Sequence, residues 1–127
     1  MSKYGEAAVK TVQYIKENQL ESPKTAWEII TKEIFGEGTA SQKKGCPKTT
    51  FLGLCGTGIV SGIPKGAYTT SQKNKKYGLK ALELIRKNPD LIQDKKTLWL
   101  ETIGHEKKVH NSQMDVVIEL WKNEMME

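Results

Sequence analysis

The sequence lacks the features that mark secreted and membrane proteins. Only two of its 127 residues are cysteines, too few for the disulfide framework of a small secreted domain. Its first ten residues contain no apolar core of the signal-peptide type. The most apolar run, residues 51–60, spans ten residues and contains three glycines, whereas a membrane-spanning helix needs about 20 apolar residues. These absences predict a soluble, cytoplasmic protein that does not enter a membrane.

Acidic residues are absent from a long central stretch. Between Thr39 and Leu82 there is no aspartate or glutamate, and the same stretch contains eight lysines. Since the whole chain has a net charge of only +5, the remainder is net acidic. Segregated charge of this kind says little about the fold, but it predicts a surface for an anionic partner. The candidate binding residues are Lys43, Lys44, Lys48, Lys65, Lys73, Lys75 and Lys76.

Sheet-type alternation is also missing, and helical patterning takes its place. Apolar residues recur at steps of three and four in six segments, near residues 3–18, 23–35, 47–55, 71–87, 95–103 and 112–125. The segments are bounded by start and stop signals at Ser22-Pro23, Cys46-Pro47, Asp94, Asn111, Gly36 and Gly104. We therefore predict one all-α domain over residues 1–127, a compact bundle of about five or six helices. The glycines and proline within residues 59–68 permit a small hairpin there.

Three stretches of the sequence carry a family resemblance. The first stretch begins with Lys3-Tyr4-Gly5-Glu6, the second with Lys44-Gly45-Cys46-Pro47 and the third with His110-Asn111-Ser112-Gln113. The second stretch continues through Phe51-Leu52-Gly53-Leu54-Cys55 to Gly62-Ile63-Pro64. On these residues the chain resembles a family of small bacterial proteins that is defined only as a domain of unknown function. The resemblance implies a small intracellular bacterial protein, and it brings no activity, cofactor or catalytic residue with it.

Catalytic candidates are few. Cys46 precedes a proline at a predicted helix start, where the helix dipole and the neighbouring lysines favour a thiolate. A thiol-based enzyme or redox sensor would combine Cys46 as nucleophile with His110 as base and Asp115 as the group that orients the base. The simpler interpretation is a half-buried cysteine and ordinary helix capping near residue 111. The sequence therefore does not predict an enzyme.

Metal and cofactor motifs are missing as well. Cys46 and Cys55 are nine residues apart, and His105 and His110 are five apart, which does not match paired zinc ligands. The glycines of residues 53–58 fit neither pattern of a phosphate-binding loop, so we interpret them as packing and helix-end residues. No metal and no cofactor are predicted.

Three functions remain open. The first is a non-catalytic binding module that uses the lysine-rich residues 43–80 for a polyanion, either nucleic acid or an acidic protein. A helical domain with a wing at 59–68 would place residues 47–55 in the recognition position. That helix is mostly apolar and lacks the arginine and asparagine that read bases, so contact with the backbone of the nucleic acid is predicted.

The second function is a helical adaptor or homodimer that pairs through Met114, Trp121 and Met125. The third is the thiol chemistry of Cys46.

Overall fold

The computed structural model of this chain describes residues 2–19 and 22–127. It contains six α-helices and a 3₁₀ turn and, over these residues, no strand, which confirms the all-α prediction. In order along the chain these are α1 (Lys3–Asn18), α2 (Pro23–Phe35), α3 (Gly45–Gly56), α4 (Gln72–Lys87), η1 (Pro89–Gln93), α5 (Lys95–Ile103) and α6 (Gln113–Lys122).

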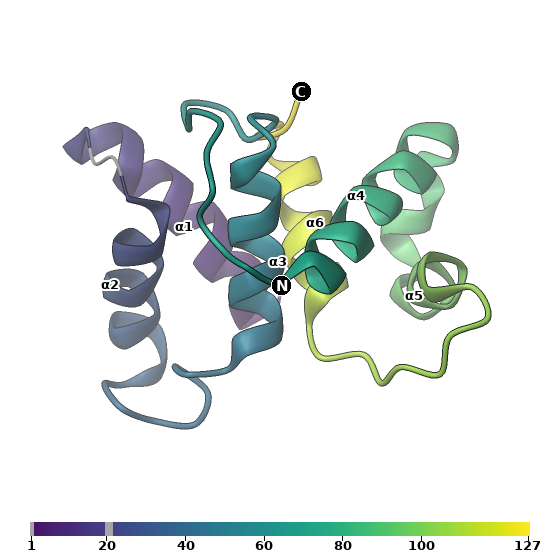
Figure 1. Cartoon of the computed structure of the whole chain (residues 1–127), viewed down its shortest axis with the longest axis horizontal. Coiled ribbons are helices and arrows are strands. Elements are labelled where there is room, and N and C mark those ends of the chain that lie inside the picture. Colours follow the sequence, from purple (N-terminus) through teal and green to yellow (C-terminus); the bar gives the residue numbers. More distant parts are fainter. Residues whose placement is uncertain (1, 20–21) are drawn as a thin grey trace.

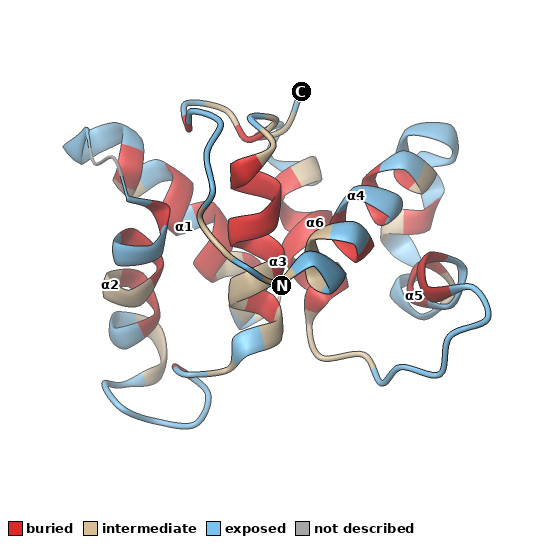
Figure 2. Cartoon of the chain, in the orientation of Figure 1, coloured by how far each residue is buried: buried red, intermediate tan, exposed pale blue. Residues whose placement is uncertain are grey.

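Two central helices organise the bundle. α3 and α6 lie in the middle, with α1 and α2 on one side and α4 and α5 on the other (Figure 1). All residues of 51–56 in α3 and of 113–120 in α6 are buried (Figure 2). The apolar part of α3 is therefore covered by its own neighbours and cannot be inserted into a nucleic-acid groove. This burial removes the basis for comparing α3 with the recognition helix of a winged domain.

The helix boundaries follow local capping. The Ser22 hydroxyl accepts a hydrogen bond from the backbone nitrogen of Thr25 at 3.2 Å, and the Asp94 carboxylate accepts one from Thr97 at 3.1 Å. The start of α6 differs from the prediction, because Asn111 is not its cap. Ser112 occupies the cap position with a φ of 69°, and Nε2 of His110 accepts the hydrogen bond of the Met114 backbone nitrogen at 3.1 Å.

The hairpin permitted at residues 59–68 does not form. Val60 pairs instead with Met126 near the carboxyl end of the chain, and the Ser61 nitrogen donates to the Met125 oxygen at 2.8 Å. Pro64 has no backbone N–H to contribute to a hairpin ladder. The segment from residue 57 to residue 71 consequently runs across the molecule to the start of α4 (Figure 1).

Glycines allow two close helix crossings. A Cβ atom on Gly53 of α3 would lie 2.6 Å from the Cβ and 2.8 Å from the Cα of Lys75 in α4. A Cβ atom on Gly5 of α1 would lie 2.9 Å from the backbone oxygen of Asp115 in α6. These distances are shorter than real Cβ contacts, so both crossings require glycine. The interpretation of Gly53 as a packing residue is consistent with this geometry.

A partly buried chain of hydrogen-bonded side chains joins α3, α4 and α6 at one end. Gln113 of α6, which is fully buried, accepts a hydrogen bond from the Asn111 nitrogen at 2.6 Å and donates to Asn74 of α4 at 3.3 Å. Asn74 in turn donates to the Thr49 hydroxyl of α3 at 2.8 Å. Because buried polar groups must find partners, this chain fixes the starts of α3, α4 and α6 relative to one another.

The helices of this protein are short. None of those in the described part of the chain is both long and apolar enough to cross a bilayer.

Candidate anion-binding site

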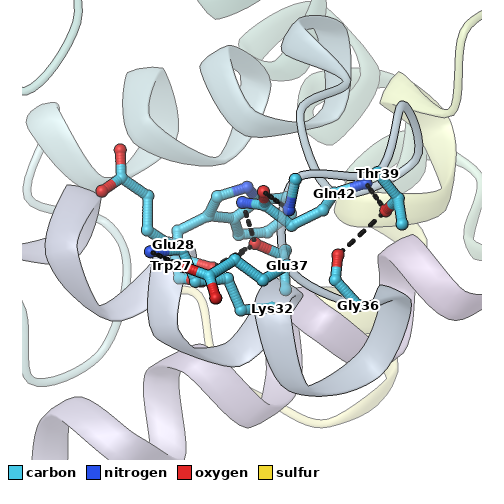
Figure 3. Close-up of polar contacts among 9 residues, drawn as sticks. Trp27, Glu28, Lys32, Gly36, Glu37, Thr39 and Gln42 are labelled. Atoms are coloured by element: carbon cyan, nitrogen blue, oxygen red, sulfur yellow. Dashed lines mark hydrogen bonds and ion pairs between the residues drawn. The ribbon is translucent and has the colours of Figure 1, made fainter.

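The connection between α2 and α3 is an ordered loop, because one buried glutamine holds it. Gln42 is 8% exposed, its amide donates to the Thr31 hydroxyl at 3.3 Å, and its side-chain oxygen accepts from the Gly38 nitrogen at 3.3 Å. The Thr39 hydroxyl accepts from the Gln42 backbone nitrogen at 3.2 Å, inside the same loop (Figure 3). These bonds set where the chain enters α3.

Lysines line an open groove bounded by α2, α3 and residues 67–70, which we call the α2–α3 groove. Its volume is about 480 Å³. Lys24 of α2, Lys43 of the loop and Lys48 of α3 contribute the positive charge. None of the described residues that line it is acidic. The hydroxyl-bearing residues around it are Thr49, Tyr68, Thr69 and Thr70.

The first turn of α3 opens into this groove. No side chain caps the turn at Lys44, and the backbone N–H groups of Gly45 and Cys46 have no acceptor among the described residues. Gly45 is one of the residues that line the groove. Free N–H groups and the positive end of a helix dipole attract anions. Lysines, threonines and an open helix start together resemble the donor set that binds phosphate groups in proteins.

A smaller recess adjoins the groove and shares Lys43 and Lys48 with it; we call it the Trp27 recess. Its volume is about 270 Å³, and Trp27, Glu28, Lys32 and Gln42 complete its lining. The indole of Trp27 is 1% exposed and stacks on Phe51 with ring centroids 5.2 Å apart. Its Nε1 atom is buried without a hydrogen-bond partner among the described atoms. Figure 3 shows Trp27 beside Gln42 beneath the ordered loop.

The other predicted lysines lie elsewhere. Lys44 is half-buried, and its ammonium nitrogen lies 5.2 Å from the centre of the Tyr4 ring in α1, a cation–π contact. Lys65 packs near Gly58, and Lys75 packs on Gly53. The seven candidates therefore do not all line one groove: only Lys43 and Lys48 reach the α2–α3 groove.

Acidic residues from outside the acid-free stretch reach some of its lysines. Glu28 of α2 lies 3.3 Å from Lys48, and Glu106 lies 3.2 Å from Lys73. Lys43 and Lys24 have no ion-pair partner among the residues that the structure describes. The positive charge of the acid-free stretch is therefore kept at Lys43 in the α2–α3 groove and is partly cancelled at Lys48 and at α4.

A second groove lies between α4 and α5 and has mixed charge. It has a volume of about 690 Å³ and is lined by Lys75, Lys76 and Lys80, but also by Glu83 and Glu106. The buried Tyr77 donates its phenol proton to Glu106 at 2.8 Å. Burial, followed by this bond, raises the pKa of Tyr77 to about 12, and the same bond lowers the pKa of Glu106. The two glutamates beside its three lysines make this groove a poorer place for a polyanion than the α2–α3 groove.

The residues of the thiol hypothesis are not joined. Cys46 is half-buried and has no hydrogen bond to a histidine among the described residues. Nε2 of His110 is already used as the acceptor for Met114, and Asp115 accepts from Lys95 at 2.7 Å. Burial lowers the pKa of His110, which favours the neutral ring that this acceptor role requires. His105 is exposed, and no group of three metal-ligating side chains occurs within residues 2–19 and 22–127.

Several residues of the site were not singled out from the sequence. Lys24 lies outside the acid-free stretch, and nothing in the sequence places it opposite α3. The ring of Trp27 belongs to the core, and nothing in the sequence signals that its N–H is unpaired. In the sequence, Gln42 is one polar residue among several in the connection between α2 and α3. Its burial has no local sequence signal, because only the packing of α2 against the loop covers it.

The structure defines an all-helical protein with a lysine-lined groove at the start of its central helix. The chain belongs to the Family of unknown function (DUF6979), whose model matches residues 1–127. The resemblance carried by the three sequence stretches is thereby confirmed at the level of a domain of unknown function. None of the curated proteins and none of the solved structures with which the chain was compared matches it.

Proposed function

We propose that this protein is a non-catalytic binding module that holds a polyanionic strand, such as a nucleic acid, by its phosphate backbone along the α2–α3 groove. The observation that carries the proposal is the meeting of Lys24, Lys43 and Lys48 with the uncapped first turn of α3 in a groove whose described lining has no acid. The groove offers no arginine, asparagine or glutamine to read base edges. Backbone contact without sequence readout is therefore the expected mode.

Binding of this kind depends on salt. Each lysine that neutralises a phosphate releases condensed counterions, and log K falls against log salt with a slope of about −0.7 per contact on a single strand. Replacing all three lysines (Lys24→Gln, Lys43→Gln, Lys48→Gln) should weaken binding and make the slope shallower by about two. Fluorescence anisotropy of a labelled single-stranded oligonucleotide at several salt concentrations measures both quantities.

The control removes equal charge from another face. Lys96, Lys107 and Lys108 are exposed and do not line the α2–α3 groove, so Lys96→Gln, Lys107→Gln and Lys108→Gln form the matched triple variant. Lys95 is left intact because it pairs with the buried Asp115. Equal losses from the two triple variants would mean that only total charge matters. The proposal is abandoned if the wild type binds no strand even at low salt.

Two other functions have less support. The thiol proposal requires a base near Cys46, and His110 serves another bond. Pairing through the C-terminal helix would have to use Trp121, because Met114 and Met125 are buried within their own chain. Trp121 borders a shallow depression of about 560 Å³ with Ile92 and Met126. A homodimer would use this depression.

The setting in which the module acts is likewise our proposal. Both cysteines are free thiols, which suits the reducing cytoplasm. The family resemblance adds the expectation of a bacterial source.

A further inference from the structure

We propose that the Trp27 recess is a subsite for one phosphoryl group, bound by the indole N–H of Trp27 and the ammonium group of Lys43. The inference rests on the proposed function only in that the recess and the α2–α3 groove share Lys43 and Lys48. The ligand chemistry is that of a phosphate oxyanion. It comes either from the phosphorylated end of a bound strand or from the free ion.

The first step is the unpaired donor. An indole N–H can only donate, and the Nε1 atom of Trp27 is buried with no acceptor among the described atoms. Buried polar groups of native proteins are nearly always hydrogen-bonded, so an unsatisfied one calls for an explanation. By comparison, the indole N–H of Trp99 donates a hydrogen bond to the backbone oxygen of Lys108 at 3.1 Å. An oxygen acceptor in the recess would satisfy Trp27 in the same way.

The second step is charge, which selects an anion over a neutral acceptor. Among the described residues that line the recess are three lysines, Lys32, Lys43 and Lys48, and a single acid, Glu28. Glu28 engages Lys48 at 3.3 Å, and Lys32 lies 3.8 Å from Glu37 just outside. Lys43 is the lysine of the recess without an ion-pair partner in the described part of the chain. One oxyanion would neutralise it.

The third step is size and access. A volume of about 270 Å³ lies below the roughly 300–1,000 Å³ of sites for drug-sized ligands, so the recess suits an ion or an end group rather than a whole nucleotide. The Nε1 atom has almost no accessible surface, so an entering oxygen must displace a lining side chain. Gln42 is held by two hydrogen bonds. Lys43 is exposed and flexible, and it is the side chain expected to move.

The test observes the indole directly in the full-length protein. Inorganic phosphate is titrated into ¹⁵N-labelled protein while the three tryptophan indole N–H signals are recorded, with Trp27→Phe assigning the Trp27 signal. We expect the Trp27 signal to shift with saturation while those of Trp99 and Trp121 stay in place. Lys43→Gln should weaken the phosphate affinity by about tenfold, as for loss of a charged hydrogen bond, and Lys107→Gln should leave it unchanged.

Matched additions separate the sources of the ligand. Two strands are compared, one with a terminal phosphate and one without. If only the phosphorylated strand shifts the Trp27 signal, the recess binds strand ends. A shift with inorganic phosphate alone assigns it to the free ion. The inference is overturned if neither shifts the signal, if sodium chloride at equal ionic strength shifts it as much, or if Lys43→Gln titrates like the wild type. Salt-dependent binding of the unphosphorylated strand tests the groove separately, so the two proposals can fail independently.

Discussion

At the scale of single residues, burial decides which polar groups have a fixed role. Gln42 and Gln113 are both buried and both make two hydrogen bonds through their side-chain amides. Gln42 fixes the loop that enters α3, and Gln113 joins the starts of α4 and α6. Each holds one edge of the region where the groove lies, although neither carries charge. The same burial sets the chemistry of the cysteines and of His110.

The two cysteines should differ sharply in reactivity. Cys55 is fully buried, and burial raises the pKa of its thiol well above the ordinary value. Cys46 is half-buried in the first turn of α3, within reach of a reagent. Iodoacetamide at neutral pH, followed by peptide mapping, should label Cys46 at least tenfold faster than Cys55. Equal or reversed labelling would remove the basis for any thiol chemistry at Cys46.

His110 should make the stability of the fold depend on pH. Burial lowers its pKa; Lys95 and Lys44 act in the same direction and Asp115 opposes them. The unfolded state therefore binds more protons just below the ordinary value of 6.5, so stability rises with pH in this window and is lost as pH falls through about 6.5. Urea unfolding measures the free energy of unfolding at pH 7.5 and at pH 5.5. The difference between these two free energies should be smaller for His110→Gln than for the wild type.

The matched control for this experiment is His105→Gln. His105 is exposed and makes no hydrogen bond among the described residues. Its replacement should leave the change in the free energy of unfolding between pH 7.5 and pH 5.5 the same as in the wild type. If His110→Gln also leaves that difference intact, the capping role of the neutral imidazole is refuted.

At the scale of helices, the close crossing of α3 and α4 depends on a glycine, Gly53, which has no side chain. Gly53 lets the backbone of Lys75 come so close that a methyl group has no space. The crossing brings Asn74 of α4 within 2.8 Å of the Thr49 hydroxyl, and Thr49 lines the α2–α3 groove. The packing of α3 on α4 therefore supports the groove as well as the core.

Gly53→Ala should destabilise the protein by about 1–3 kcal/mol, the usual cost of overpacking a well-packed core. The control is Gly45→Ala in the same helix, where a Cβ atom would meet nothing within 4 Å. That change should be neutral or raise stability by up to about 1 kcal/mol through helix propensity. Urea unfolding measures both variants, and similar free energies of unfolding for the two would show that the crossing is not as tight as described.

At the scale of the whole molecule, packing redistributes the charge that the sequence separates. Lys48, Lys73 and Lys80 of the acid-free stretch each lie within 4.0 Å of a glutamate from outside it. Such exposed pairs contribute little stability, but they reduce the positive potential at Lys48 in the groove and around α4. The α2–α3 groove stays positive because Lys24 adds to Lys43 and none of the described residues that line it is acidic. The salt dependence proposed above is thus a property of this one face.

The local features of this fold could be predicted from the sequence alone. Helical periodicity and caps such as Ser22 and Asp94 act between residues at most four apart, so the observed helices begin and end close to the predicted positions. The acid-free stretch could likewise be recognised in the sequence, because it is a matter of composition alone. It singled out Lys43 and Lys48, which line the groove, and also Lys44, which contacts Tyr4 instead.

How these features combine depends on contacts that the packed fold makes and that no local pattern predicts. The tertiary structure placed Lys24 opposite α3, paired Val60 with Met126 in place of a hairpin, and buried the Trp27 N–H without a partner. Each of these contacts joins residues that are far apart in the sequence or depends on what covers a side chain from another element. Such contacts are fixed by how helices pack, and glycines such as Gly53 set that packing through the space they leave empty.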